Sequence, residues 1–117
     1  MIRVLTGVAV AAMMIPVAAV AQYTGPGATA VHQTVKAVLA DGRDDQPVVL
    51  RGRLVKQLSS DKYMFADDTG QIRVEIDRHL FAAQPVSDST PIELRGEVEA
   101  EYLQSPEVDV DSLLVLP

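Results

Sequence analysis

Two runs of alternating apolar and polar residues, joined by a short polar turn, form the clearest pattern in the chain. Both lie within residues 61–77, which read DKYMFADDTGQIRVEID. In the first run, Tyr63 and Phe65 fall on one face. In the second run, the apolar residues that alternate strictly with charged ones are Ile72, Val74 and Ile76. A period of two, rich in β-branched and aromatic residues, is typical of half-buried antiparallel strands. The stretch therefore predicts a β-hairpin whose inner face belongs to the core.

The turn of this hairpin is expected at Asp67-Asp68-Thr69-Gly70. Aspartate favours tight turns by bonding nearby backbone, and the pattern predicts a positive φ at Gly70 that closes the hairpin with a bulge. The same turn chemistry accounts for Asp67, Asp68 and Asp77 better than a calcium site does. Such a site gathers about six or more oxygen ligands, and the turn lacks the spaced Asp/Asn ladder of a dedicated loop. No metal site is predicted.

Three further segments repeat the alternation and complete an all-β domain. They are residues 48–58, 91–99 and 107–116. The positions expected to face inward are Val48, Leu50, Leu54, Ile92, Leu94, Val98, Val108 and Val110, with Arg51, Arg53, Glu93, Arg95, Glu97, Glu99, Asp109 and Asp111 facing outward. Gly52 and Gly96 lie in mid-strand, where glycine typically marks a bulge or a sharp bend. Five short strands, two of them bent, predict a small closed barrel, because closure removes exposed edges.

A helix is expected before the barrel and a plug within it. Apolar residues recur at helical spacing at Val31, Val35, Val38 and Leu39. We expect Thr29 to cap this helix and Gly42 to end it. After the hairpin, residues 78–90 carry Leu80, Phe81 and Val86, spaced for a helical turn or loop that plugs an open end of the barrel.

The first 21 residues have the pattern of a cleaved signal peptide. Arg3 supplies the positive charge, residues 4–17 form an apolar core, and Ala19-Val20-Ala21 is an A-x-A cleavage site. A retained membrane anchor is disfavoured, since the apolar run is near the lower length limit for spanning and contains Pro16. The expected organisation is a signal peptide at 1–21 and a domain at 22–117, with lead-in and helix at 22–46 and barrel at 47–117.

Composition narrows the classes of partner. There is no cysteine, so an exported chain would hold together by its core alone and would have no lipid attached at its mature start. Without Arg3, nine basic residues face 16 acidic ones, a net charge of −7 with neutral histidines. This charge repels nucleic acid and anionic lipid and favours cationic partners.

Several segments, taken in order, resemble one family. They are Gly25-Pro26 before a helix, VVLRG at 48–52, the hairpin from Tyr63 to Asp77, Gly96-Glu-Val, and Glu107-Val-Asp-Val. This combination is similar to the bacterial OB-fold (BOF) family of periplasmic stress-tolerance proteins and covers nearly all of residues 22–117. The resemblance implies an OB-fold barrel with an N-terminal helix, a periplasmic location and a role in envelope stress, and it carries over no catalytic residue. Phe81 and Tyr102 stand where members often have Trp.

Two surfaces are candidates for binding. OB-folds bind ligands across strands two and three and the adjoining loops, and the outward residues there would be Arg51, Arg53, Lys62, Met64, Arg73 and Glu75. The pattern disfavours nucleic acid as a ligand of this OB-face, because bases stack on outward aromatic side chains and Tyr63 and Phe65 are expected to face the core. The second surface is an acidic face on strands four and five, made by Glu97, Glu99, Asp109 and Asp111. It would either be merely solvated or bind a cationic small molecule, peptide or envelope protein.

No enzyme signature is present. His32 and His79 are the only histidines and no cysteine can join them, so a site for a transition metal, with three or four convergent ligands, is not expected. The sequence predicts a monomeric, non-catalytic, exported binding module that needs no cofactor. The alternatives are a hydrolase acting on an envelope polymer and a single-stranded nucleic-acid binder.

Overall fold

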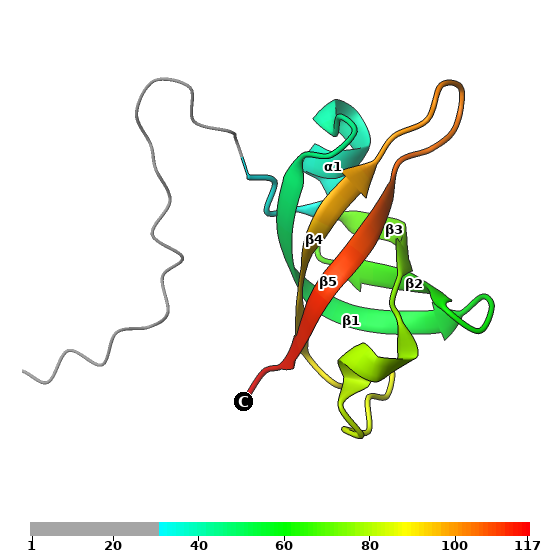
Figure 1. Cartoon of the computed structure of the whole chain (residues 1–117). Helices are drawn as coiled ribbons and strands as arrows, with labels where there is room; N and C mark the ends of the chain where they lie inside the picture. Colours follow the sequence, from blue (N-terminus) through cyan, green and yellow to red (C-terminus); the bar gives the residue numbers. More distant parts are fainter. Residues whose placement is uncertain (1–30) are drawn as a thin grey trace, which may run out of the picture.

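Five strands close into a barrel in the order β1-β2-β3-β5-β4 (Figure 1). The computed structural model describes residues 31–117, so the expected signal peptide, the lead-in and Thr29 lie outside the described residues. The elements are α1 (Val35–Asp41), β1 (Pro47–Gln57), β2 (Lys62–Asp67), β3 (Gly70–Glu75), the 3₁₀ helix η1 (Arg78–Phe81), β4 (Ile92–Glu99) and β5 (Glu107–Val115). The predicted five-stranded OB-fold barrel is confirmed. In the described part of the chain, no helix is long and apolar enough to cross a membrane.

Strand β1 closes the barrel by changing partners at its glycine. Its first half pairs with β4 as far as Gly52, and its second half pairs with β2 from Arg53 onward. A Cβ at Gly52 would overlap the carbonyl oxygen of Ala66 and approach Phe65 Cζ to 2.8 Å. The bulge itself lies three residues later, at Val55. Gly52 is thus required by a close approach of two strands.

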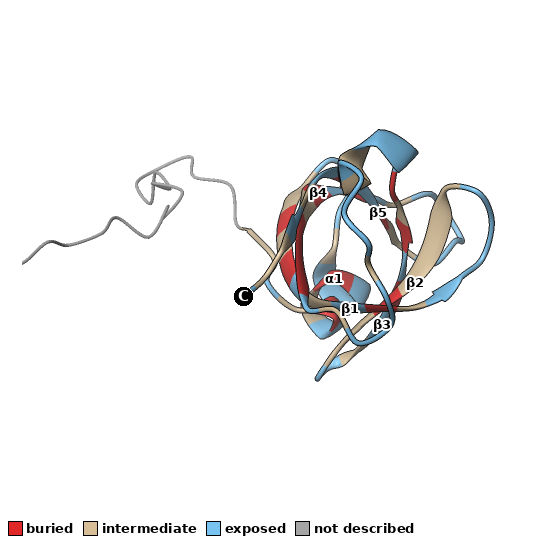
Figure 2. Cartoon of the chain, turned by 90° about the horizontal axis from the view of Figure 1, so that it is seen from below, coloured by how far each residue is buried: buried red, intermediate tan, exposed pale blue. Residues whose placement is uncertain are grey.

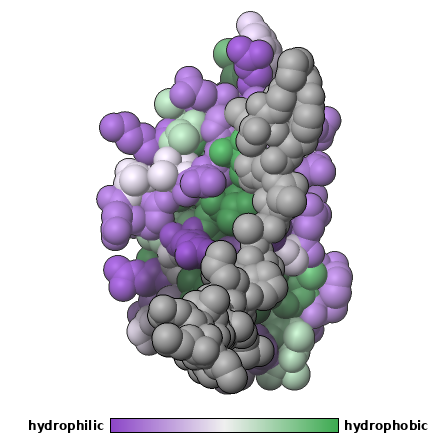
Figure 3. Space-filling model, turned by 90° about the vertical axis from the view of Figure 1, so that its left-hand side faces the viewer, coloured by the Kyte–Doolittle hydropathy of each residue, from purple (hydrophilic) through white to green (hydrophobic). Residues whose placement is uncertain are grey.

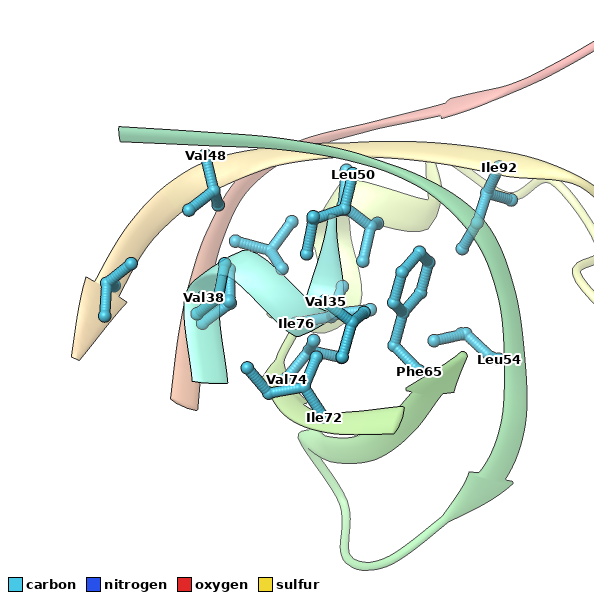
Figure 4. Close-up of a cluster of buried hydrophobic side chains, with 14 residues drawn as sticks. Val35, Val38, Val48, Leu50, Leu54, Phe65, Ile72, Val74, Ile76 and Ile92 are labelled. Atoms are coloured by element: carbon cyan, nitrogen blue, oxygen red, sulfur yellow. The ribbon is translucent and has the colours of Figure 1, made fainter. Parts of the chain in front are cut away.

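The core is the inner face that the alternation predicted. Fourteen apolar residues are buried: Val35, Val38, Val48, Leu50, Leu54, Phe65, Ile72, Val74, Ile76, Ile92, Leu94, Val98, Val108 and Val110. Their side chains converge inside the barrel (Figure 4), and the buried positions line its interior when the barrel is viewed from below (Figure 2). The eight inward positions expected on the first, fourth and fifth strands are all among them.

Helix α1 and η1 cover opposite ends of the barrel (Figure 1). Val35 and Val38 of α1 are fully buried, and Leu80, Phe81 and Val86 pack partly buried against the core, as the plug was expected to do. The helix is shorter than predicted, because it begins at Val35 with Thr34 as its N-cap. The preceding residues are extended, and His32 forms a parallel bridge with Val48 of β1. Placing Val31 inside the helix was therefore wrong.

The hairpin turn also differs from the prediction. Asp67 and Gly70 pair directly, with no bulge in this hairpin, and Gly70 does not adopt a positive φ. Asp67 holds the turn instead: its Oδ1 accepts hydrogen bonds from the backbone N–H groups of Thr69 (2.7 Å) and Gly70 (3.1 Å). Its Oδ2 accepts from Val35 N–H at 2.9 Å, which joins the turn to the start of the helix. The Asp67 carboxylate thus accepts hydrogen bonds from backbone N–H groups of both the turn and the first residue of the helix.

Candidate functional site

Three carboxylates from three different strands converge on the outside of the barrel. Glu75 of β3, Glu99 of β4 and Asp109 of β5 can each place one oxygen within 4.8 Å of the oxygens of the other two. The strand order brings them together, because β5 lies between β3 and β4. Asp109 is paired in register with Glu75, through the parallel β3–β5 pairing, and with Glu97 on β4. We call Glu75, Glu99 and Asp109 the acidic cluster.

The acidic face expected from the sequence is divided by the barrel. Glu99 and Asp109 belong to the acidic cluster, and Glu97 lies beside Asp109. Asp111 falls at the register shift between β4 and β5, where Gly96 pairs with Val110 and the preceding residue pairs with Ser112. Glu75 was assigned to the OB-face, and only the parallel pairing of β3 with β5 reveals its place in the cluster.

Burial and mutual repulsion disfavour the charged forms of two members of the cluster. The pKa of Glu75 is raised by partial burial and by the charges of Asp109 and Asp61. The pKa of Glu99 is raised by partial burial and by the charges of Asp109 and Glu75. Clustered like charges raise one another's pKa values unless a cation neutralises them. Lys62, which pairs in register with Glu75 and also forms an ion pair with Glu107, lowers both pKa values but does not offset the effects that raise them.

The two cations of the OB-face beside the cluster are held by a different carboxylate. Glu107 accepts hydrogen bonds from Arg73 Nη1 at 2.7 Å and from Lys62 Nζ at 3.3 Å. Burial raises the pKa of Glu107, but these two hydrogen bonds and charges outweigh it and lower the pKa. Met64 lies in register with Arg73 on the hairpin and lines a small cavity with it. Lys62 and Arg73 are therefore both engaged in ion pairs within the protein.

The two arginines of the OB-face on β1 lie in another place. Arg51 donates from Nε to Glu93 Oε2 at 3.0 Å, and Arg95 donates from Nε to Glu93 Oε1 at 2.8 Å. Glu93 was expected to face solvent, but it is only 4% exposed. The hydrogen bond from Arg95 lowers its pKa, against the effect of burial and together with the bond from Arg51. Glu93 does lie on the outer face of β4, as predicted. The side chains of Arg51 and Arg95 cover it there, so the prediction that it is exposed was wrong.

Arg51 and Arg53 line a cavity of about 620 Å³. A second cavity, of about 450 Å³, has Tyr63 and Phe81 in its wall, with their ring centroids 5.7 Å apart in an edge-to-face arrangement. Tyr63 has the core phase that the sequence predicted, yet part of it reaches the surface. On the side of the molecule shown in Figure 3, hydrophilic side chains surround smaller apolar areas.

The two histidines occupy separate places and neither is hydrogen bonded to a hydroxyl group of a described residue. His32 Nε2 lies 2.8 Å from Gln46 Oε1, and His79 Nδ1 lies 2.7 Å from Asp77 Oδ1. A Ser-His pair would need the hydroxyl within hydrogen-bond reach of the ring. Within residues 31–117, neither histidine is therefore part of a Ser-His pair.

The raised pKa values predict how stability changes with pH. A carboxylate whose pKa is higher in the folded than in the unfolded state destabilises the fold above the folded pKa, and this cost is relieved as pH falls through it. We expect the wild-type melting temperature to rise on acidification from about pH 7 towards the ordinary glutamate range near 4.5. At still lower pH it should fall, because Asp67, Glu93 and Glu107 have lowered pKa values and lose their stabilising charge.

The measurement is thermal unfolding followed by circular dichroism across this pH range. The double variant Glu75→Gln/Glu99→Gln should melt higher than wild type at pH 7 and should lack the rise on acidification. A wild-type rise that persists unchanged in the double variant would show that other groups cause it.

Comparison with known proteins gives one consistent result. The family model described as "Bacterial OB fold (BOF) protein" matches residues 12–115. The calcium-regulated OB-fold protein CarO of Pseudomonas aeruginosa is 46% identical over 96 residues, covering 82% of this chain and 81% of CarO. Protein YgiW of Escherichia coli is 38% identical over 71 residues, covering 61% of this chain and 54% of YgiW.

Solved structures agree with the sequence relatives. The structure of YgiW from Escherichia coli superposes with a TM-score of 0.66 at 32% identity, covering 79% of this chain and 94% of that chain. The OB domain of MM0293 from Methanosarcina mazei has a TM-score of 0.51 at 17% identity, covering 73% of this chain and 84% of that one. The second likeness concerns the fold alone.

Proposed function

The chain belongs to the bacterial OB-fold (BOF) family, and from this premise we propose that it is an exported, non-catalytic binding module whose acidic cluster takes a small cation. The observation that carries the proposal is the convergence of Glu75, Glu99 and Asp109 within 4.8 Å. The pattern of the first 21 residues supports export to the periplasm, and the family resemblance supports a role in envelope stress.

The geometry of the cluster suits one ion. Calcium binds oxygen ligands at about 2.3–2.6 Å, so oxygens that surround a single ion lie at most about 5 Å apart. The carboxylate oxygens of the acidic cluster meet that limit. Three carboxylates fall short of the usual six to eight ligands, and water would complete the shell, which favours a weak and exchangeable site. The name of the relative CarO, a calcium-regulated protein, makes Ca²⁺ the first cation to test.

A cation would also remove the repulsion that, after the larger effect of partial burial, raises the pKa values of Glu75 and Glu99. Binding should therefore compete with protons, and affinity should fall as pH is lowered into the range in which Glu75 and Glu99 titrate. A polyamine or a cationic peptide would act on the same charges. These ligands share the charge but differ from Ca²⁺ in size.

The test is calorimetric titration of the protein purified from a periplasmic fraction, whose intact mass should correspond to a chain that begins at Gln22. Ca²⁺, Mg²⁺, spermidine and a single-stranded oligonucleotide are titrated in turn at low and at moderate salt. We expect saturable binding of Ca²⁺ to the wild-type protein. The variant Glu75→Gln/Glu99→Gln/Asp109→Asn should bind Ca²⁺ with an affinity at least tenfold lower. Removing three ligands of one ion should have that effect or more.

The matched control changes the same amount of charge elsewhere. Asp41, Asp88 and Asp111 are exposed and lie outside the cluster, so their joint change to asparagine should leave Ca²⁺ affinity within about twofold. Equal losses in both triple variants would mean that only the net charge attracts cations. Binding of spermidine but not Ca²⁺ would replace the metal by an amine as the ligand. A full-length protein found in the membrane fraction would contradict the export part of the proposal.

A further inference from the structure

The cavity of about 620 Å³ lies beside the bend of β1, apart from the acidic cluster. Arg51, Gly52 and Arg53 form one side of it, and the hairpin turn from Asp67 to Thr69 forms another. The remaining wall includes Thr34, Ser89 and Pro91. None of the three residues of the acidic cluster lines the cavity, so it is a separate feature with its own chemistry.

Two arginines line this cavity. Arg51 and Arg53 are two residues apart in a strand, so their side chains project from the same face about 6.6 Å apart along it. Arg51 is oriented by its bond from Nε to Glu93, whose side chain is 5% exposed, and that bond leaves both Nη groups available. Arg53 forms no ion pair with any residue between 31 and 117. The planar fork of arginine suits a carboxylate or phosphate group.

The backbone between the two arginines is closely packed. Gly52 lies so close to the carbonyl oxygen of Ala66 that no Cβ would fit, and β1 changes partner from β4 to β2 at this residue. Arg51 is held from the other side through Glu93, which Arg95 also binds. A site that is ordered before the ligand arrives loses less entropy on binding.

The hairpin turn contributes two aspartates to the lining of the cavity. Asp67 is saturated by hydrogen bonds from Val35, Thr69 and Gly70, so it serves the fold. Asp68 is exposed, and its side chain forms no hydrogen bond with the described residues. A free carboxylate that lines the same cavity as two arginines disfavours polyanions and can accept hydrogen bonds from an ammonium group.

We propose that this cavity binds a small zwitterion, with its carboxylate or phosphate group on Arg51 and Arg53 and its ammonium group near Asp68. A free amino acid or short peptide would supply the carboxylate form, and an ethanolamine phosphate would supply the phosphate form. The inference goes beyond cation binding at the acidic cluster and does not depend on it.

The test follows backbone amide shifts by NMR while glycylglycine, phosphoethanolamine, acetate and inorganic phosphate are titrated into the mature protein. Saturable shifts should be confined to residues 51–53 and 66–69, and the two zwitterions should bind tighter than acetate and phosphate. Arg53→Gln should weaken the zwitterions about tenfold, since a charge-assisted bond is lost while the exposed side chain leaves the fold intact. Tighter binding of glycylglycine would identify a carboxylate ligand, and tighter binding of phosphoethanolamine would identify a phosphate ligand.

Two control variants separate the site from general charge. Arg43→Gln removes an exposed arginine outside the cavity and should change affinity less than twofold. Asp68→Asn should weaken the zwitterions and strengthen inorganic phosphate, a reversal that a loss of structure cannot produce. The triple variant of the acidic cluster should keep zwitterion binding, so failure of one site is distinguishable from failure of the other. The proposal is overturned if no probe gives saturable shifts, or if Arg43→Gln is as harmful as Arg53→Gln.

Discussion

Replacing Phe65 with alanine is expected to lower the free energy of unfolding by about 3–5 kcal/mol, the range observed for a buried phenylalanine. The ring is fully buried at the centre of the barrel, close to Leu54 and Ile92 in Figure 4. Its Cζ also lies beside Gly52, where β1 changes partners, so removal leaves a void at the bend. A domain of this size has a total stability of about 5–15 kcal/mol, and the variant should lose a large part of it.

Equilibrium unfolding in urea measures the effect of Phe65→Ala. The control is Leu103→Ala, because Leu103 is 87% exposed in the loop between β4 and β5 and should change stability by no more than about 0.5 kcal/mol. A midpoint for Phe65→Ala that matches the control would mean that the ring is not part of the core.

Replacing Gly96 with alanine should cost about 1–3 kcal/mol or more, through overpacking against backbone. A Cβ there would overlap the carbonyl oxygen of Asp109 and lie 2.9 Å from Val110 Cα, and neither atom can move without shifting β5. The register shift between β4 and β5 is at this residue. Because Asp109 belongs to the acidic cluster, the same change should also weaken any cation bound there.

The matched control for Gly96→Ala is the glycine of the hairpin turn. A Cβ at Gly70 would meet Val35 Cγ1 at 3.5 Å, an ordinary contact, and Gly70 does not require a positive φ. Gly70→Ala should therefore be neutral or stabilise by up to about 1 kcal/mol, because alanine restricts the unfolded chain. Thermal unfolding of Gly96→Ala and Gly70→Ala compares the two effects on stability. Equal destabilisation would show that Gly70 does need the left-handed region.

The acidic cluster and the cavity are built from different strands. One site carries three carboxylates across β3, β5 and β4, and the other carries two arginines on β1. Lys62 and Arg73 are the other two basic residues that the sequence assigned to the OB-face. Both form ion pairs with Glu107. Among the described residues, three of the four basic side chains of the OB-face are thus engaged in ion pairs, Arg51 with Glu93 and Lys62 and Arg73 with Glu107.

The alternation of apolar and charged residues was enough to identify the strands and the core. Phe65, Ile72, Val74 and Ile76 are buried as their period requires, because side chains on a strand alternate between the two faces whatever the strand pairs with. The mid-strand glycines were recognised as bends for a similar local reason. The helix start and the turn at Gly70 were predicted wrongly. Thr34 caps the helix through Ala37 N–H, and Asp67 holds the turn while also accepting a hydrogen bond from Val35 N–H, a contact between distant parts of the chain.

What only the tertiary structure decided is which outward residues become neighbours. Glu75 joins Glu99 and Asp109 because β3 runs parallel to β5, a pairing between strands more than 30 residues apart. Glu93 is covered because Arg51 and Arg95 flank it on the closed sheet, and Arg51 and Arg53 face a cavity because β1 leaves β4 for β2 at Gly52. Alternation reports the face on which a side chain lies, and this follows from local geometry. The partners on that face follow from barrel closure, which depends on the whole chain at once.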